Sequence, residues 1–125
     1  MQELKAPMSG DFKPTPTVSI KEKEGTFFEG TFLSYKEVAS QYEHPWNVYD
    51  FEVKDTNMPV TVKNGKEYVP AIVIPGEKVA IFAPTRLHNI LKGQQPDTDI
   101  RIEYMGMVKA GKKGGRAHSY KVYSL

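Results

Sequence analysis

The chain has 125 residues and a mass of 14.1 kDa, with 39% hydrophobic and 26% charged residues, which is the composition of one globular domain. It contains no cysteine, which excludes a disulfide framework and thiolate metal sites, and no apolar run reaches the roughly 18 residues of a membrane-spanning helix. Residues 1–10 lack the apolar core of a signal peptide, so we expect a cytoplasmic protein with no membrane partner.

The formal net charge of +2 conceals an uneven distribution along the chain. Residues 25–75 carry a charge of −3 and residues 105–125 carry +5, whereas residues 1–24 and 76–104 are neutral. The C-terminal segment has no acidic residue, and its cations are Lys109, Lys112, Lys113, Arg116 and Lys121. Such a cluster is typical of a surface that binds a polyanion. The alternative is a solvated loop that only keeps the protein soluble.

The N-terminal 24 residues predict a flexible arm, because prolines, threonines, serine and glycine dominate a segment that cannot pack a core of its own. A single domain over residues 25–125 follows. Its first half shows strand patterns at residues 26–35, 49–54, 60–62, 69–74 and 78–82. Between the third and fourth of these, Asn64-Gly65 is a strong hairpin signal.

The second half begins with the one predicted helix, residues 84–91, where Pro84 suits the first turn and Gly93 follows the end. Apolar residues then alternate with charged ones over residues 100–104, which predicts another strand. Residues 110–117 are rich in glycine and lysine and predict a loop, and a last strand includes Tyr120 and Val122.

This order of elements predicts a mainly β protein, a five-stranded OB-fold barrel with one short helix between its third and fourth strands. An SH3-like barrel is the chief alternative. The helix ahead of the fourth strand favours the OB-fold.

No enzyme motif is complete, and we expect a non-enzymatic protein without cofactor or metal. Gly106, Gly111 and Lys112 satisfy the first seven positions of the phosphate-binding pattern G-x-x-x-x-G-K-[ST], but Lys113 replaces the hydroxyl residue that would hold magnesium. The three histidines have no metal-ligand spacing. Ser119 lies outside any nucleophile elbow.

Aromatic residues in the predicted connection between the first two strands indicate a binding surface. Proteins that bind single-stranded nucleic acid stack bases on such side chains and follow the phosphates with a basic groove. The predicted stacking residues are Tyr35, Tyr42, Trp46 and Tyr49. For Tyr35 and Tyr49, the sequence does not distinguish a core position from one at the rim of the barrel. The alternative for Trp46 is a position that covers one end of the barrel.

The predicted phosphate contacts come from the basic segment. In an OB-fold, the loop joining strands one and two and the loop joining strands four and five flank the groove, so the aromatic and the basic segments would meet there. The residues that we expect at the phosphates are Lys109, Lys112, Lys113, Arg116, His118 and Lys121.

Four segments in this order resemble the small OB-fold single-stranded DNA-binding proteins encoded by phages of Gram-positive bacteria. They are residues 29–35 (EGTFLSY), 48–51 (VYDF), 99–106 (DIRIEYMG) and 119–122 (SYKV). The resemblance implies a protein that coats single-stranded DNA during replication or recombination in the bacterial host cytoplasm. It is compatible with replication or recombination proteins as partners and with a homo-oligomer. The chain lacks the acidic tail by which bacterial relatives recruit partners.

Two other functions remain open on the sequence. An OB-fold can serve as a protein-interaction module or subunit, in which case the exposed aromatics meet another protein. The same groove can also bind single-stranded RNA.

Overall fold

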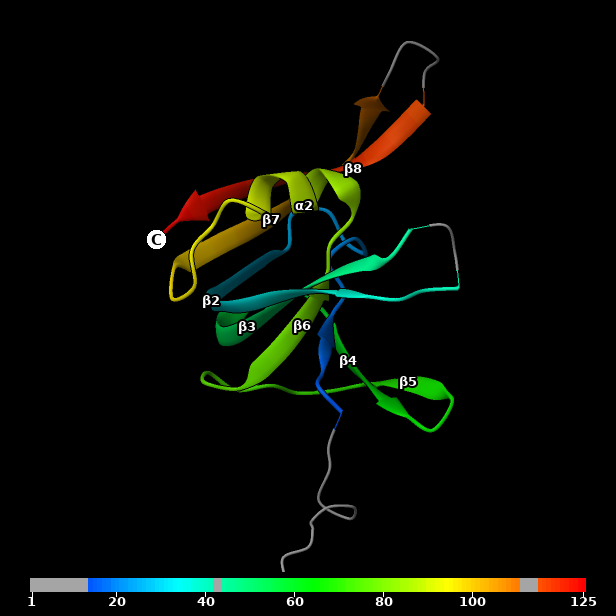
Figure 1. Cartoon of the computed structure of the whole chain (residues 1–125), viewed down its shortest axis with the longest axis vertical. Helices are drawn as coiled ribbons and strands as arrows, with labels where there is room; N and C mark the ends of the chain where they lie inside the picture. Colours follow the sequence, from blue (N-terminus) through cyan, green and yellow to red (C-terminus); the bar gives the residue numbers. More distant parts are fainter. Residues whose placement is uncertain (1–13, 42–43, 111–114) are drawn as a thin grey trace, which may run out of the picture.

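One curved sheet of eight strands and a single short helix make up the computed structural model, which describes residues 14–41, 44–110 and 115–125 (Figure 1). The strands are β1 (Thr17–Val18), β2 (Phe27–Val38), β3 (Trp46–Thr56), β4 (Val60–Asn64), β5 (Glu67–Pro70), β6 (Lys78–Phe82), β7 (Asp99–Ala110) and β8 (Gly115–Ser124), and the helix is α2 (Thr85–Leu91). Their order in the sheet is β5-β4-β1-β6-β3-β2-β7-β8. The mainly β prediction is therefore confirmed.

The prediction of five strands closed into a barrel is wrong for the described residues. The sheet is open, with β5 and β8 at its two edges. The extra strands are β1 and the antiparallel β4–β5 hairpin, which turns at Asn64-Gly65 with Gly65 at φ 69°. This hairpin pairs with β1 rather than joining the long strands directly, so the strong turn signal belongs to an added unit.

The core lies on the concave side of the long strands, where alternate side chains of β2 and β3 meet. Phe28, Phe32 and Phe51 are buried, and the rings of Phe28 and Phe51 contact edge to face at 5.3 Å. The predicted helix is confirmed, and it adds the fully buried Leu87 and Leu91 to the same core. In Figure 1, α2 covers one end of the curled sheet, on the path from β6 to β7.

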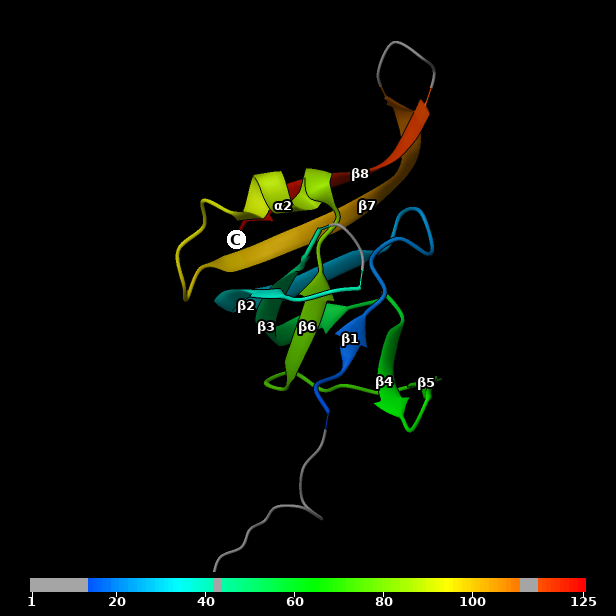
Figure 2. The same ribbon diagram turned by 45° about the vertical axis from the view of Figure 1, so that its right-hand side comes forward.

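Residues 14–24 do not form part of a flexible N-terminal arm as predicted, because they pack against the domain. Val18 and Ile20 are only 2% and 3% exposed. Strand β1 pairs parallel with β6 and antiparallel with β4, and the Gly25 N–H donates to the Tyr104 carbonyl at 2.8 Å (Figure 2). The segment thus lies between β6 and the β7–β8 pair, where its alternating apolar residues cover the core. The rest of the predicted arm, residues 1–13, lies outside the described residues.

The β7–β8 hairpin includes residues 110 and 115–117 of the predicted basic loop. Strand β7 continues to residue 110 and β8 begins at residue 115, and the four residues between them lie outside the described part of the chain. The register shifts between Tyr104 and Gly106, where Gly106 has φ 86° and the Glu24 side chain occupies the space that a β-carbon would need. Beyond this bulge the hairpin projects from the rest of the sheet (Figure 1). We call this projecting part of the β7–β8 hairpin, residues 106–110 and 115–119, the arm; it is distinct from the N-terminal segment.

Candidate nucleic-acid interface

The predicted stacking residues Tyr35 and Trp46 lie within strands, not in a connection, and on opposite faces of the β2–β3 pair. A register shift between Phe32 and Ser34 places one extra residue in β2. Beyond that bulge Tyr35 is paired with Tyr49, on the core side, and Val38 is paired with Trp46, on the outer side. The structure therefore separates these aromatics. Tyr42 lies outside the described residues.

The core-side aromatics form a hydrogen-bonded cluster beneath α2. Tyr49 is 1% exposed, and its hydroxyl oxygen lies 2.8 Å from Nδ1 of His88. The Tyr35 ring stacks on the His88 ring, with centroids 5.6 Å apart, and its hydroxyl donates to Oδ1 of Asn47 at 2.7 Å. We call Tyr35, Tyr49 and His88 the inner cluster. Because its side chain is buried, Tyr49 has no ring face to offer a base, and its prediction as a stacking residue is not retained.

Burial also alters the acid–base chemistry of the inner cluster. It raises the pKa of the Tyr49 hydroxyl to about 12, and the neighbouring Tyr35 adds to the rise. The pKa of Tyr35 is raised as well, first by partial burial and then by the carboxylate of Glu37. Both hydroxyls are therefore neutral at physiological pH, and they serve as hydrogen-bonding groups rather than as bases.

The outer face carries a different aromatic pair. Trp46 and Phe82 are 45% and 39% exposed, and their rings meet edge to face with centroids 6.0 Å apart. The position of Phe82 in β6 agrees with the alternation of that strand. Phe82 lies on the same side as the exposed Lys78, whereas Val79 and Ile81 lie on the opposite side and are buried.

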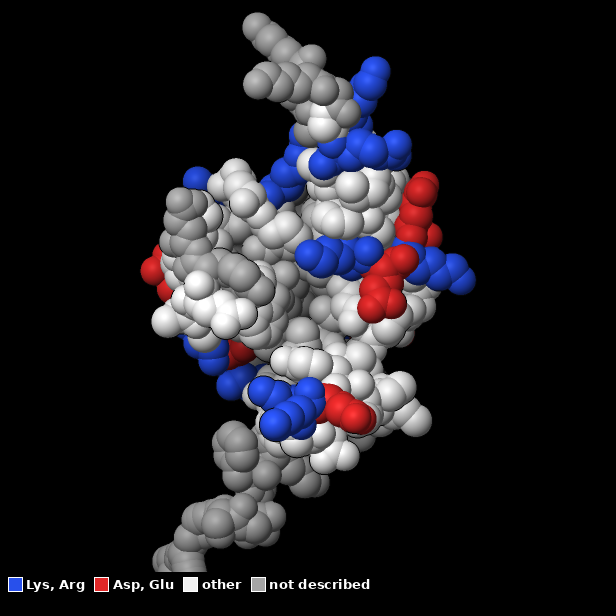
Figure 3. Space-filling model, turned by 90° about the vertical axis from the view of Figure 1, so that its right-hand side faces the viewer, with Lys and Arg blue, Asp and Glu red and all other residues white. Residues whose placement is uncertain are grey.

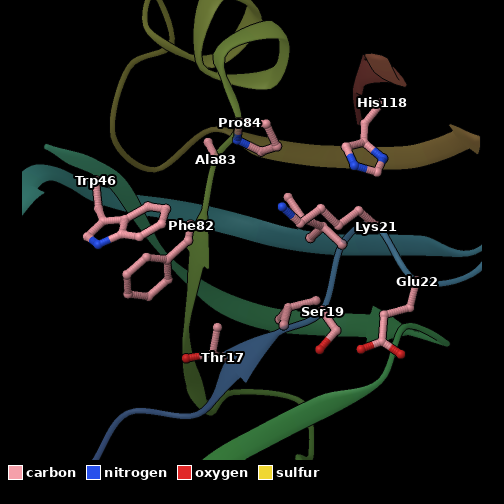
Figure 4. A pocket seen from close by; sticks show the side chains of 11 residues that line it. Thr17, Ser19, Lys21, Glu22, Trp46, Phe82, Ala83, Pro84 and His118 are labelled. Carbon is pink, nitrogen blue, oxygen red and sulfur yellow. The ribbon is translucent and has the colours of Figure 1, made fainter. Parts of the chain in front are cut away.

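A cavity of about 500 Å³ adjoins this pair (Figure 4). Trp46 and Phe82 lie on one side of it, residues 17–22 lie opposite, and His118 of β8 reaches toward Lys21 from above. Nδ1 of His118 lies 2.7 Å from the Tyr104 hydroxyl oxygen, which fixes the orientation of the imidazole ring. The cavity thus combines aromatic rings with the ammonium group of Lys21, the carboxylate of Glu22 and a ring nitrogen.

A second hollow, of about 260 Å³, continues the first along the outer face. The two share Thr17 and Phe82 in their linings. Its remaining lining residues come from the N-terminal segment, β2, β3, β6 and the β4–β5 hairpin, and are Pro14, Thr15, Lys36, Val38, Val48, Asp50, Lys63, Tyr68 and Ala80. We call the two hollows together the outer groove. Figure 3 shows the molecule hollowed between two lobes, with Lys and Arg side chains gathered above this hollow, around the arm.

The arm brings some of the predicted cations to the groove. Lys109 and Arg116 face each other across the hairpin, and both are exposed. Both lie on the same face of the hairpin as His118, one residue pair of that face further from the cavity. Lys121 has the opposite phase and points away from this row. Lys112 and Lys113 lie outside the described residues.

Among the residues that the structure describes, no group of three histidine and acidic side chains could hold a metal ion. No helix in the described ranges is long and apolar enough to cross a membrane. We find no match to this chain among protein-family models, curated protein sequences or solved structures.

Proposed function

We propose that this protein is a non-enzymatic, largely sequence-independent binder of single-stranded DNA, and that the strand lies in the outer groove. The observation that carries the proposal is the exposed Trp46–Phe82 pair, which lines a hollow next to the basic arm. The charged side chains of the hollow itself are Lys21 and Glu22. Unpaired bases stack on aromatic rings, and each such contact contributes about 1 to 3 kcal/mol of binding free energy.

The connectivity of the long strands supports an OB-fold. Five of them follow the order β6-β3-β2-β7-β8, and α2 lies between β6 and β7 in the chain. In OB-folds, oligonucleotides bind across the second and third strands, which correspond here to β3 and β6. Trp46 and Phe82 belong to these two strands. In place of direct pairing between β6 and β8, the segment around β1 covers the seam.

The charges along the groove suit a phosphate backbone. Lys21 lines the first hollow, Lys36 and Lys63 line the second, and Lys109 and Arg116 extend along the arm. A single strand is preferred over a duplex because the base faces of a duplex are stacked on one another and cannot reach the aromatic pair. The biological role that fits is the coating of single strands during DNA replication or recombination.

The test is a fluorescence titration, because Trp46 is the only tryptophan. We expect oligo-dT to quench its emission and an equal-length duplex to leave the emission unchanged. Oligo-U of the same length measures the preference for DNA over RNA. Absence of both quenching and a mobility shift with oligo-dT would refute the proposal.

A protein-interaction role is the second candidate, and exposed aliphatic side chains favour it. Ile72 and Ile74 are 94% and 62% exposed in the segment after β5. Solvent exposure of two neighbouring isoleucines is typical of a contact surface when it forms part of a larger apolar patch. This role predicts that the wild type does not bind oligo-dT. It also predicts that substitution of both isoleucines by serine abolishes binding of a protein partner.

A further inference from the structure

The β4–β5 hairpin stands beside the outer groove, although it is not one of the five long strands. It joins the sheet through β1, which in turn pairs with β6 at Thr17 and Ala80. Figure 2 shows β4 and β5 next to β1, below the crossing of β6 and β2. Strand β1 separates the hairpin from β6, but side chains of the hairpin, β3 and β6 line the same hollow.

The second hollow of the groove uses two side chains of this hairpin as its wall. Lys63 of β4 and Tyr68 of β5 are paired across the hairpin, and both line the hollow. Tyr68 is 62% exposed, more than either ring of the Trp46–Phe82 pair. Strand β3 contributes the buried Val48 and Asp50 to the same lining. The exposed Tyr68 ring thus lines a hollow with one apolar and one acidic β3 side chain, and an exposed ring of this kind can stack on a nucleobase.

The one carboxylate in this hollow is already compensated. Asp50 is 4% exposed, and its Oδ2 lies 3.9 Å from Nζ of Lys36 and 3.6 Å from Nζ of Lys78. The Ser34 hydroxyl donates to the same oxygen at 3.4 Å. Lys63 also lines the hollow, so Lys36, Lys63 and the Asp50 partner Lys78 outnumber the one carboxylate, and an incoming phosphate meets net positive charge.

We infer that Tyr68 and Lys63 form a second nucleotide subsite on the same DNA strand that the Trp46–Phe82 pair holds. Tyr68 stacks on a base, and Lys63 with Lys36 contacts the adjoining phosphates. The shared Thr17 and Phe82 place the two subsites along one continuous path. The inference rests on the proposed function and deepens it, because it assigns the hairpin to DNA binding and lengthens the site.

The experiment compares Tyr68→Ala, Tyr68→Phe and wild type in binding to oligo-dT of about 4 and about 16 nucleotides, the limits of site sizes in OB-folds. For the longer oligomer we expect Tyr68→Ala to lower affinity about fivefold or more, the equivalent of one lost base stack. Tyr68→Phe should retain the affinity, because it keeps the ring. The short oligomer should bind all three alike, since it fits on the Trp46–Phe82 pair.

Tyr123→Ala is the matched control, because this tyrosine is 43% exposed on β8 and lines neither hollow. We expect wild-type affinity from it, and wild-type thermal unfolding from all three variants. Equal affinity of Tyr68→Ala and wild type for the longer oligomer would overturn the subsite, as would equal losses in Tyr68→Ala and Tyr68→Phe. A wild type that binds no oligo-dT at all would instead remove the proposed function itself.

Discussion

The two faces of the β2–β3 pair carry similar aromatic residues with different partners. On the core side, Tyr49 is buried and Tyr35 is 41% exposed, and the inner cluster is held by hydrogen bonds between Tyr49 and His88 and from Tyr35 to Asn47. On the outer side, Trp46 presents nearly half of its surface next to Phe82. The number of aromatic residues therefore says little about where a ligand binds. Exposed fraction alone does not separate the faces, because Tyr35 and Trp46 are 41% and 45% exposed. The difference is that the Tyr35 ring packs on Tyr49 and His88, whereas Trp46 meets Phe82 at a hollow on the outer face.

The largest expected effect tests the structural side of this comparison. Tyr49→Ala removes a buried ring that contacts Phe32 and Tyr35, so we expect the free energy of unfolding to fall by about 3 to 5 kcal/mol. Urea denaturation followed by circular dichroism measures the loss. Oligo-dT affinity of the folded fraction should stay unchanged. A large loss of affinity with normal stability would return Tyr49 to the binding surface.

Alkaline pH offers a second way to probe the inner cluster. An unfolded tyrosine ionises near pH 10, whereas the folded pKa of Tyr49 is about 12. Between these values the unfolded state has released its proton and the folded state has not, so stability falls as pH rises. The contribution is complete below about pH 10 and lost above about pH 12, on the order of 2 kcal/mol in all.

Tyr49→Phe is the control for this pH dependence. Unfolding free energies measured at a series of pH values should decline less steeply in the variant than in wild type. Some decline should remain, because burial also raises the pKa of Tyr120. Identical slopes for variant and wild type would show that the Tyr49 hydroxyl is not linked to folding.

The outer side of the comparison is tested by Trp46→Ala against Tyr35→Ala. Loss of the exposed indole should weaken oligo-dT binding about tenfold, within the range for one base stack, with little change in thermal stability. Tyr35→Ala should show the reverse pattern, because its ring packs on Tyr49 and His88. Fluorescence anisotropy of labelled oligo-dT measures both affinities. Equal losses of affinity in the two variants would contradict the separation of the faces.

Much of the core follows from alternation in the sequence, but the division of the aromatics does not. The buried positions Phe51 and Val53 and the helix over α2 are predictable, because their periodicity is regular. The bulge between Phe32 and Ser34 inserts one residue and reverses the phase of everything after it. A pattern-based prediction has no means to locate such an insertion. It also ends the first strand at residue 35 and begins the second at residue 49, so it assigns Tyr35 and Trp46 to one connection, whereas β2 extends to residue 38 and β3 begins at residue 46.

The burial of residues 14–24 cannot be predicted from the sequence for a related reason. Val18 and Ile20 stand in a stretch with nearby prolines, which is typical of an arm, and their burial depends on a seam that only the folded sheet creates. Phe82 is different, because its phase within β6 was readable from the sequence. Local pattern thus finds strand faces, whereas bulges and seams require the tertiary arrangement.

The smallest expected effect concerns the two faces of the arm. The salt dependence of single-strand binding changes by about 0.7 in slope for each phosphate contact, so the double variant Lys109→Ala/Arg116→Ala should reduce the slope by about 1.4. Lys121→Ala removes the same kind of charge from the opposite strand phase and should leave the slope nearly unchanged. Titrations at several salt concentrations measure both. If Lys121→Ala reduced the slope by as much per charge as the double variant does, net charge rather than position on the arm would govern binding.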